Sequence, residues 1–169
     1  MPSTPDLNPL RALAADPAAQ AAYAVTLLAP AAGRPAHMAA LDALGKHPTP
    51  DARPALMALY EHLSASGPKR DAGAFLRRAI VEALRPVALP ADAALLAAAA
   101  STVERMPPFF KDEAVGLRAA ALLALNEVDA ELAAFHATRL LVDEHADPMS
   151  GEPGVSAAVR KSWAGVSSH

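Results

Sequence analysis

Apolar residues recur at helical spacing along almost the whole chain, and proline and glycine separate the runs. Pairs such as Asp16-Pro17 and Thr49-Pro50 mark helix starts, because an oxygen-bearing side chain caps the first turn and proline loses no hydrogen bond there. β-branched residues are sparse and do not alternate with polar ones, so little strand is expected. We therefore predict short helices over residues 9–15, 17–29, 35–46, 50–65, 71–85, 90–105, 112–126, 129–143 and 154–164.

One segment of the chain occurs twice, about forty residues apart. Segments 71–84 and 112–125 both begin with Asp, carry Leu-Arg with the Arg six residues after the Asp, and end in Ala-Leu. The second helices of the first three pairs align without gaps, so that Leu44, Leu84 and Leu125 share one column. Such a period is typical of stacked helix pairs rather than of a globular enzyme core. We therefore expect an all-α superhelix (solenoid) of about four helix pairs in one domain, 1–169, with repeats over 9–46, 50–85, 90–126 and 129–164.

The forty-residue period and the Asp-to-Arg spacing resemble those of HEAT repeats. In that family the Asp and the Arg form a ladder between neighbouring repeats, along the inside of a superhelix. The first unit departs from the pattern, because His37 stands where Arg is expected, and the last unit has Gly154 six residues before Arg160. The resemblance implies the ladder role for Asp71, Arg77, Asp112 and Arg118.

The simpler alternative is that the two Asp residues only cap helices while the two Arg residues lie in solvent. A ladder has a physical reason, because a half-buried charge is costly unless it is paired. One contact repeated at each junction would also fix the rotation between successive helix pairs. We favour the ladder, since both copies agree in spacing and in the apolar residues around them.

Composition narrows the chemistry. The absence of cysteine excludes disulfides, thiolate metal sites and cysteine nucleophiles. The sequence contains neither a Gly-x-Ser-x-Gly elbow nor a glycine-rich phosphate loop, and its histidines lack zinc-protease spacing. The segment Asp143-Glu144-His145-Ala146-Asp147 offers oxygen and nitrogen ligands but not the spacing of a calcium loop, so we interpret it as a solvated helix end. We predict no catalysis, no metal and no cofactor.

A basic cluster around the second repeat raises the alternative of nucleic-acid binding. HEAT-like DNA glycosylases, which the chain would resemble in architecture, need a strongly basic concave face with an aromatic and a carboxylate at the lesion. Here Glu82 interrupts the cluster, the formal charge is −3, and Trp163, the one tryptophan, lies near the C-terminal end. A subunit resembling HEAT-like bilin lyases is a further alternative, which lacks any pigment-handling motif. The cluster consists of Lys69, Arg70, Arg77, Arg78 and Arg85.

We therefore interpret the chain as a scaffold that binds a protein partner along the face of its second helices. Leu123 shares a column with Glu82 and Asp42, and an apolar residue at a position that is polar in sister repeats suggests an exposed contact. Candidate partner-binding residues on this face are Arg78, Glu82, Arg85, Arg118 and Leu123.

Two further segments are candidates for contacts. Phe109 or Phe110, in the loop of the third pair, could be an exposed anchor, although we favour a structural role in which one packs under the helices and the other covers the loop. Val159 and Trp163 would lie on an uncovered end face and could support self-association.

The N-terminal residues lack the basic region of a secretory signal. The longest apolar stretch, 87–100, falls short of the roughly 20 residues that span a bilayer. We expect no membrane association and a soluble, cytoplasmic protein of bacterial type.

Overall fold

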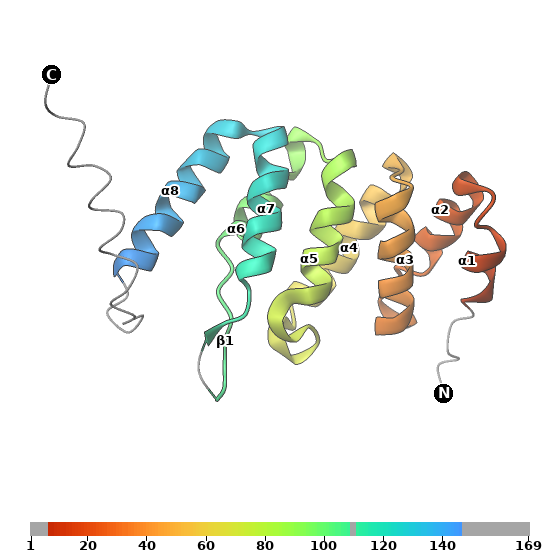
Figure 1. Ribbon diagram of the computed structural model, residues 1–169, viewed down its shortest axis with the longest axis horizontal. Coiled ribbons are helices and arrows are strands. Elements are labelled where there is room, and N and C mark those ends of the chain that lie inside the picture. The colour runs from red at the N-terminus through yellow and green to blue at the C-terminus, as the bar shows by residue number, and fades with distance from the viewer. Residues whose placement is uncertain (1–6, 109–110, 147–169) are drawn as a thin grey trace, which may run out of the picture. The chain divides into compact units, whose positions relative to one another are not determined.

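The structure is a computed structural model that describes residues 7–108 and 111–146, the side chains of Met106 and of residues 143–146 excepted. The described chain is all-α, apart from one very short hairpin (Figure 1). Its α-helices are α1 (Asn8–Ala12), α2 (Pro17–Thr26), α3 (Arg34–Lys46), α4 (Arg53–Ser64), α5 (Phe75–Leu84), α6 (Ala93–Ala100), α7 (Val115–Val128) and α8 (Ala130–Ala146). Short 3-10 turns connect or extend them: η1 (Pro30–Ala32), η2 (Pro50–Ala52), η3 (Gly67–Lys69), η4 (Ala72–Ala74), η5 (Arg85–Val87) and η6 (Pro90–Asp92).

The chain divides into two compact units, residues 1–136 and 137–169, and the boundary falls within α8. Of the second unit the structure describes residues 137–146, which continue that helix. The helix expected over 154–164 lies outside the described residues. The single domain with a fourth helix pair therefore stays a prediction.

Within the first unit, the helices pack in chain order. Each of α3, α5 and α7 contacts the helix that precedes it, namely α2, α4 and α6. In addition, α5 contacts both α3 and α7, and Figure 1 shows these three second helices side by side. The predicted pairing of the first six long helices is thus the observed one.

The burial of side chains repeats with the same period. Residues 51–62 and 91–102 follow an identical order of buried, half-buried and exposed positions, and so do residues 36–47 and 76–87. Residues 117–128 follow that second order except at Ala120 and Leu122. Because burial depends on neighbours, this agreement shows that successive helix pairs occupy equivalent environments.

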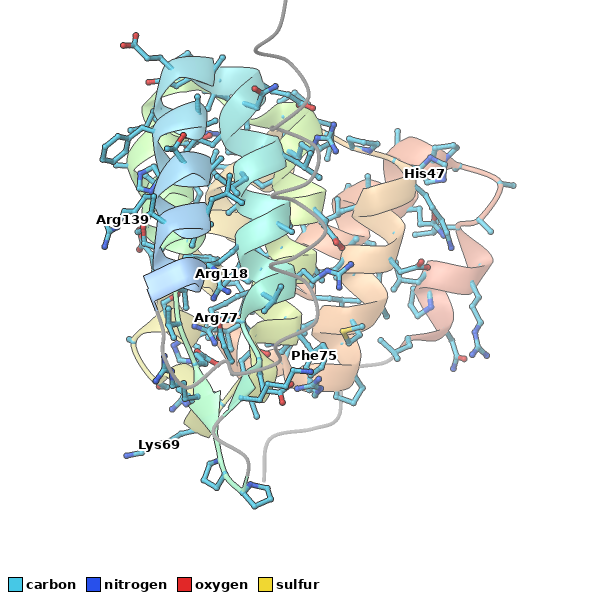
Figure 2. All side chains as sticks on the ribbon, turned by 60° about the vertical axis from the view of Figure 1, so that its left-hand side comes forward. His47, Lys69, Phe75, Arg77, Arg118 and Arg139 are labelled. Carbon is cyan, nitrogen blue, oxygen red and sulfur yellow. The ribbon has the colours of Figure 1, made fainter. Side chains whose placement is uncertain are left out.

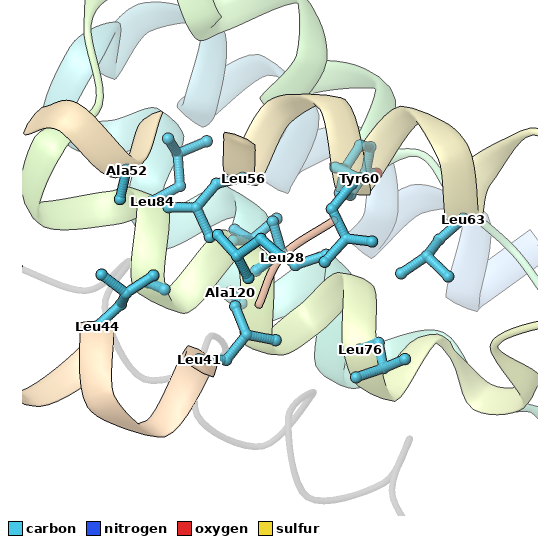
Figure 3. Packing of buried hydrophobic residues seen from close by; sticks show 14 of the residues in the cluster. Leu28, Leu41, Leu44, Ala52, Leu56, Tyr60, Leu63, Leu76, Leu84 and Ala120 are labelled. Carbon is cyan, nitrogen blue, oxygen red and sulfur yellow. The ribbon is translucent and has the colours of Figure 1, made fainter. Parts of the chain in front are cut away.

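Leucine and alanine fill the core, as the composition leads one to expect (Figure 3). Leu44, Leu84 and Leu125, which share a column, are each at most 1% exposed. Leu56 and Leu96 are equivalent to each other in α4 and α6 and are fully buried. Each such leucine contributes about 1.5–3 kcal/mol of hydrophobic free energy. Small alanines between them allow the helix backbones to approach closely.

The predicted helix over 71–85 begins only at Phe75. Gly73 has φ 72° and Ala74 has φ 54°, so the backbone leaves the right-handed helical region just before that residue. The carboxylate of Asp71 accepts hydrogen bonds from the amides of Leu76 (2.8 Å) and Arg77 (3.0 Å). The acid therefore caps the helix across an intervening turn, which the spacing alone does not reveal.

The third pair also differs from its predicted bounds. The helix over 90–105 ends at Ala100, and the helix over 112–126 begins at Val115. Between them the chain forms an antiparallel hairpin of β1 (Arg105–Met106) and β2 (Lys111–Asp112), in which Arg105 faces Asp112 and Met106 faces Lys111. Each strand of the hairpin is too short to show the alternation of apolar and polar residues from which a strand is predicted.

Candidate functional site

The predicted Asp–Arg pairs form at the starts of α5 and α7, and the first pair is fully buried. Asp71 is 0% exposed and Arg77 only 3%. The Arg77 guanidinium donates from Nε to Oδ2 of Asp71 (3.1 Å) and from Nη2 to the Asp71 carbonyl (3.2 Å). Burial lowers the pKa of Arg77, but hydrogen bonds to Glu104 and Asp71 outweigh burial, so the pKa lies above its usual value. The guanidinium remains charged in the core.

The second copy repeats the Asp–Arg pair, but its acid is half-buried and accepts hydrogen bonds from other amides. Arg118 binds Asp112 and donates to the Thr102 carbonyl (2.9 Å), while Oδ1 of Asp112 accepts from the amides of Glu104 and Ala114, at 3.0 Å each. Burial raises the pKa of Asp112, but the hydrogen bonds from those two amides and from Arg118 outweigh it. The pKa therefore lies below its usual value.

These contacts correct the predicted ladder. Each Arg binds the Asp six residues before it, in its own helix pair, rather than the Asp of a neighbouring repeat. The turn at the start of each second helix brings the Asp back against the Arg, so the spacing produces a local contact. The alternative is right for Asp71, whose carboxylate accepts from two amides of the first turn of α5. It does not hold for Asp112, which accepts from amides that precede α7. It is wrong about the arginines, which are buried (Figure 2).

Other ion pairs connect the second helix pair with the third. Arg77 also binds Glu104, which follows α6. Arg53, at the start of α4, donates from Nε to Oδ2 of Asp92 (2.8 Å) in η6.

The third such pair lies at the helix ends. Arg85, in η5, donates from Nε to Oε1 of Glu127 (2.6 Å) in α7.

The sequence prediction missed the acidic partners of these three pairs, Asp92, Glu104 and Glu127. Their separations of 39 and 42 residues, close to the repeat period, would have pointed to Asp92 and Glu127, whereas Glu104 lies in a loop without periodicity.

Four of the predicted partner-binding residues line one groove. We call it the α5/α7 groove; its volume is about 260 Å³. Arg118, the fifth candidate, does not line the groove, because it is only 8% exposed and its guanidinium binds the carboxylate of Asp112. The groove is lined by Arg78, Glu82, Arg85, Gly116, Ala119, Ala120 and Leu123.

Charged residues form one side of the α5/α7 groove, and small residues of α7 form its base. Arg78 donates from Nε to Oε1 of Glu82 (2.8 Å), one helical turn further on. The Arg78 side chain lies across α7 above Gly116, where an added Cβ would come within 3.1 Å of its Cδ and Nη1 atoms. A glycine at this position therefore lets the arginine lie close to the neighbouring backbone.

The apolar wall of the groove is Leu123, which is 56% exposed. The equivalent positions hold charged residues: Asp42, which pairs with Lys46 (2.6 Å), and Glu82. An exposed leucine thus replaces a polar group at this column, as predicted.

Among the other exposed apolar residues, Phe75 was not identified from the sequence. Phe75 begins α5 and is 57% exposed, and its ring lies against Gly73, where an added Cβ would come within 2.7 Å of Cε2 (Figure 2). Pro35 and Gly116 occupy the equivalent positions, so a column comparison would have identified it. Phe109, Phe110, Val159 and Trp163 lie outside the described residues.

The described residues contain no cluster of three His, Asp or Glu side chains suited to a metal ion. The side chains of the segment 143–147, the metal alternative considered from the sequence, lie outside that description. None of the described helices has the length and apolar content of a membrane span.

No protein-family model, curated protein or solved structure matches the chain. The functional interpretation therefore depends on the geometry of the described residues.

Proposed function

We propose that the chain is a non-catalytic binding module of HEAT-repeat type that holds a segment of a protein partner in the α5/α7 groove. The observation that carries this proposal is the exposed Leu123 opposite the charged residues Arg78 and Glu82 on adjacent second helices. Buried apolar anchors surrounded by polar groups are the usual source of binding energy in protein interfaces.

The repeat architecture supports the proposal. The second helices of the three helix pairs in the first unit share nearly the same burial pattern, and they pack against one another in chain order. Stacked pairs of this kind form extended binding surfaces in repeat proteins. A HEAT-like superhelix is our interpretation of that packing.

The groove chemistry suggests the kind of segment that binds. Gly116 allows the Arg78 side chain to lie close to α7, and Leu123 offers contact to one large apolar side chain of a partner. Arg78 and Glu82 present charges of both signs, which select a partner with complementary charges.

The ion pairs argue against nucleic acid as the partner. Arg78 pairs with Glu82, and Arg85 pairs with Glu127, so each positive charge near the groove has an adjacent negative one. A surface that follows a phosphate backbone needs an excess of positive charge.

The test is capture of partners from an extract of the source organism by three immobilised proteins. They are the parent, the groove variant Arg78→Glu/Arg85→Glu, and a control, Arg11→Glu/Arg34→Glu, whose exposed side chains lie in α1 and α3. Exposed ion pairs contribute little to stability, so all three should fold.

We expect parent and control to capture the same protein and the groove variant to lose it. Equal capture by all three would refute the groove as the binding site.

A further inference from the structure

A second cavity, of about 480 Å³, lies between the C-terminal ends of α4 and α6, in a part of the first unit that the α5/α7 groove does not include. Tyr60 and Ser64 line it from α4, and Thr102 and Glu104 line it from the segment after α6. Pro68 and Val103 supply apolar surface. Arg77 and Arg105 line it as well, so the cavity combines hydroxyl groups, one carboxylate, two guanidinium groups and a short apolar wall.

Glu104 is the unusual group in this cavity. Its side chain is more than nine-tenths buried, and Oε1 accepts a hydrogen bond from Arg77. Oε2 is also buried, and it has no hydrogen-bond partner among the described residues. A buried carboxylate oxygen without a donor is costly, so native structures rarely leave one.

The charges around Glu104 are unbalanced. One guanidinium, that of Arg77, binds two buried carboxylates, those of Asp71 and Glu104, which leaves one net negative charge in the cluster. Arg105 also lines the cavity and carries a positive charge, but it is exposed, so solvent screens its charge more than those of the buried groups. The C-terminal ends of α4 and α6 add the negative ends of two helix dipoles. The site therefore favours a positively charged hydrogen-bond donor.

The hydroxyl groups complete a set of acceptors. Thr102 donates from Oγ1 to the Ala98 carbonyl (3.1 Å), so the lone pairs of its oxygen remain to accept. Burial raises the pKa of Tyr60, against smaller opposing effects of Ser64, Arg77 and Thr102. Its hydroxyl therefore stays protonated and neutral at physiological pH, and its oxygen can still accept a hydrogen bond.

We propose that this cavity binds a primary alkylammonium group, either the side chain of a lysine or a free amine. The three N–H groups of the ammonium donate to Oε2 of Glu104 and to the hydroxyl oxygens of Tyr60 and Thr102. The carboxylate turns toward the cavity to present Oε2, while the alkyl chain lies against Pro68 and Val103. Mg²⁺ and Ca²⁺ fit less well, because both prefer several carboxylate or carbonyl oxygens in one shell.

The experiment is titration of the full ¹⁵N-labelled chain followed by NMR, with n-butylamine and with Nα-acetyl-lysine methylamide as probes. Butan-1-ol and the Nε-acetylated lysine derivative serve as uncharged controls. We expect the amide signals of Thr102 and Glu104 to shift with at least one charged probe and not with its neutral counterpart. A response to butylamine alone indicates a free amine as ligand, and a response to the lysine derivative indicates a lysine side chain.

Three variants assign the binding to the cavity. Glu104→Gln should weaken binding about tenfold or more, because it removes the negative charge. Tyr60→Phe removes one acceptor with little change in volume, and it provides the test if Glu104→Gln fails to fold. The control is Glu113→Gln, whose side chain is exposed. Absence of a response to both charged probes, or equal binding by the parent and the Tyr60→Phe variant, would overturn the proposal.

Discussion

Arg53, at the start of α4, holds the carboxylate of Asp92 in the next helix pair, although Asp92 has no exposed surface at all. The same carboxylate accepts a hydrogen bond from the Leu89 amide (2.9 Å) and so caps η6. Asp92 occupies the position that Ala52 holds in the preceding pair. One buried acid therefore both starts a helix and connects two repeats.

Asp92 should make the stability depend on pH in the acid range. Its hydrogen bond with Arg53 lowers its pKa in the folded protein, and this effect outweighs the opposing effect of burial. Because the pKa is lower in the folded than in the unfolded state, the stabilisation is complete above the unfolded pKa, about 3.9. It is lost as the pH falls through the folded pKa.

Asp92→Asn should therefore be less stable than the parent at pH 7, and the difference should shrink on acidification. Urea unfolding of both proteins at neutral and acid pH measures this change. The control is Asp51→Asn, at an exposed position. A difference between parent and Asp92→Asn that stays constant with pH would contradict the assigned role.

Arg77→Met should strongly destabilise the protein. It leaves the carboxylates of Asp71 and Glu104 buried without their shared cation, a loss that typically costs about 3–5 kcal/mol. The triple variant Asp71→Asn/Arg77→Met/Glu104→Gln should recover much of that loss, since the uncompensated charges disappear. Chemical denaturation compares the two variants with the parent. A single variant as stable as the parent would show that the cluster carries no net stabilisation.

Gly116→Ala should weaken partner binding in the α5/α7 groove without lowering the stability of the fold. Alanine is favoured over glycine by about 0.8–1.0 kcal/mol in a helix interior, and by less at the second residue of α7, where Gly116 lies. The atoms that the added methyl meets belong to the flexible Arg78 side chain. Stability should therefore stay the same or rise, while the displaced arginine narrows the groove and weakens partner capture.

Gly45→Ala in α3 is the matched control for that substitution, because a Cβ there meets no atom within 4 Å. Thermal unfolding and capture of the partner are measured on both variants. Loss of capture by both, or by neither, would count against a role of the α5/α7 groove.

The Arg85–Glu127 pair should contribute little to folding. Both side chains are more than two-fifths exposed, and exposed pairs typically contribute about 0.2–1 kcal/mol. A double-mutant cycle with Arg85→Gln and Glu127→Gln, followed by urea unfolding, measures the coupling free energy. A value well above 1 kcal/mol would instead make this pair a main connection between repeats.

The fold was predictable because its signals are local and periodic. The leucine column of Leu44, Leu84 and Leu125 identified the buried face of each second helix, and the Asp-to-Arg spacing identified two real contacts. Helix bounds were less predictable where the backbone leaves the helical region, as at Ala74. Alanine normally favours a right-handed helix, so the sequence does not indicate a φ of 54° at this position. The surrounding structure imposes it.

The partners across repeats were not predictable in the same way. The spacing of Asp71 and Arg77 along the chain says which groups lie close together locally, whereas Glu104 reaches Arg77 only after two helix pairs pack. The groove could be predicted only in part. The column of Leu123 indicated an exposed apolar position, but the position of Arg78 over Gly116 depends on how closely α5 approaches α7.

The most direct test of partner binding is photo-crosslinking from the groove itself. A photoreactive phenylalanine analogue replaces Leu123 in one protein and Ala58, an exposed residue of α4, in a matched control. After irradiation in an extract of the source organism, we predict a specific crosslinked protein from position 123 that is missing from position 58. That product should disappear when Arg78→Glu/Arg85→Glu is added. Identical crosslinks from both positions, or none from position 123, would contradict the proposal.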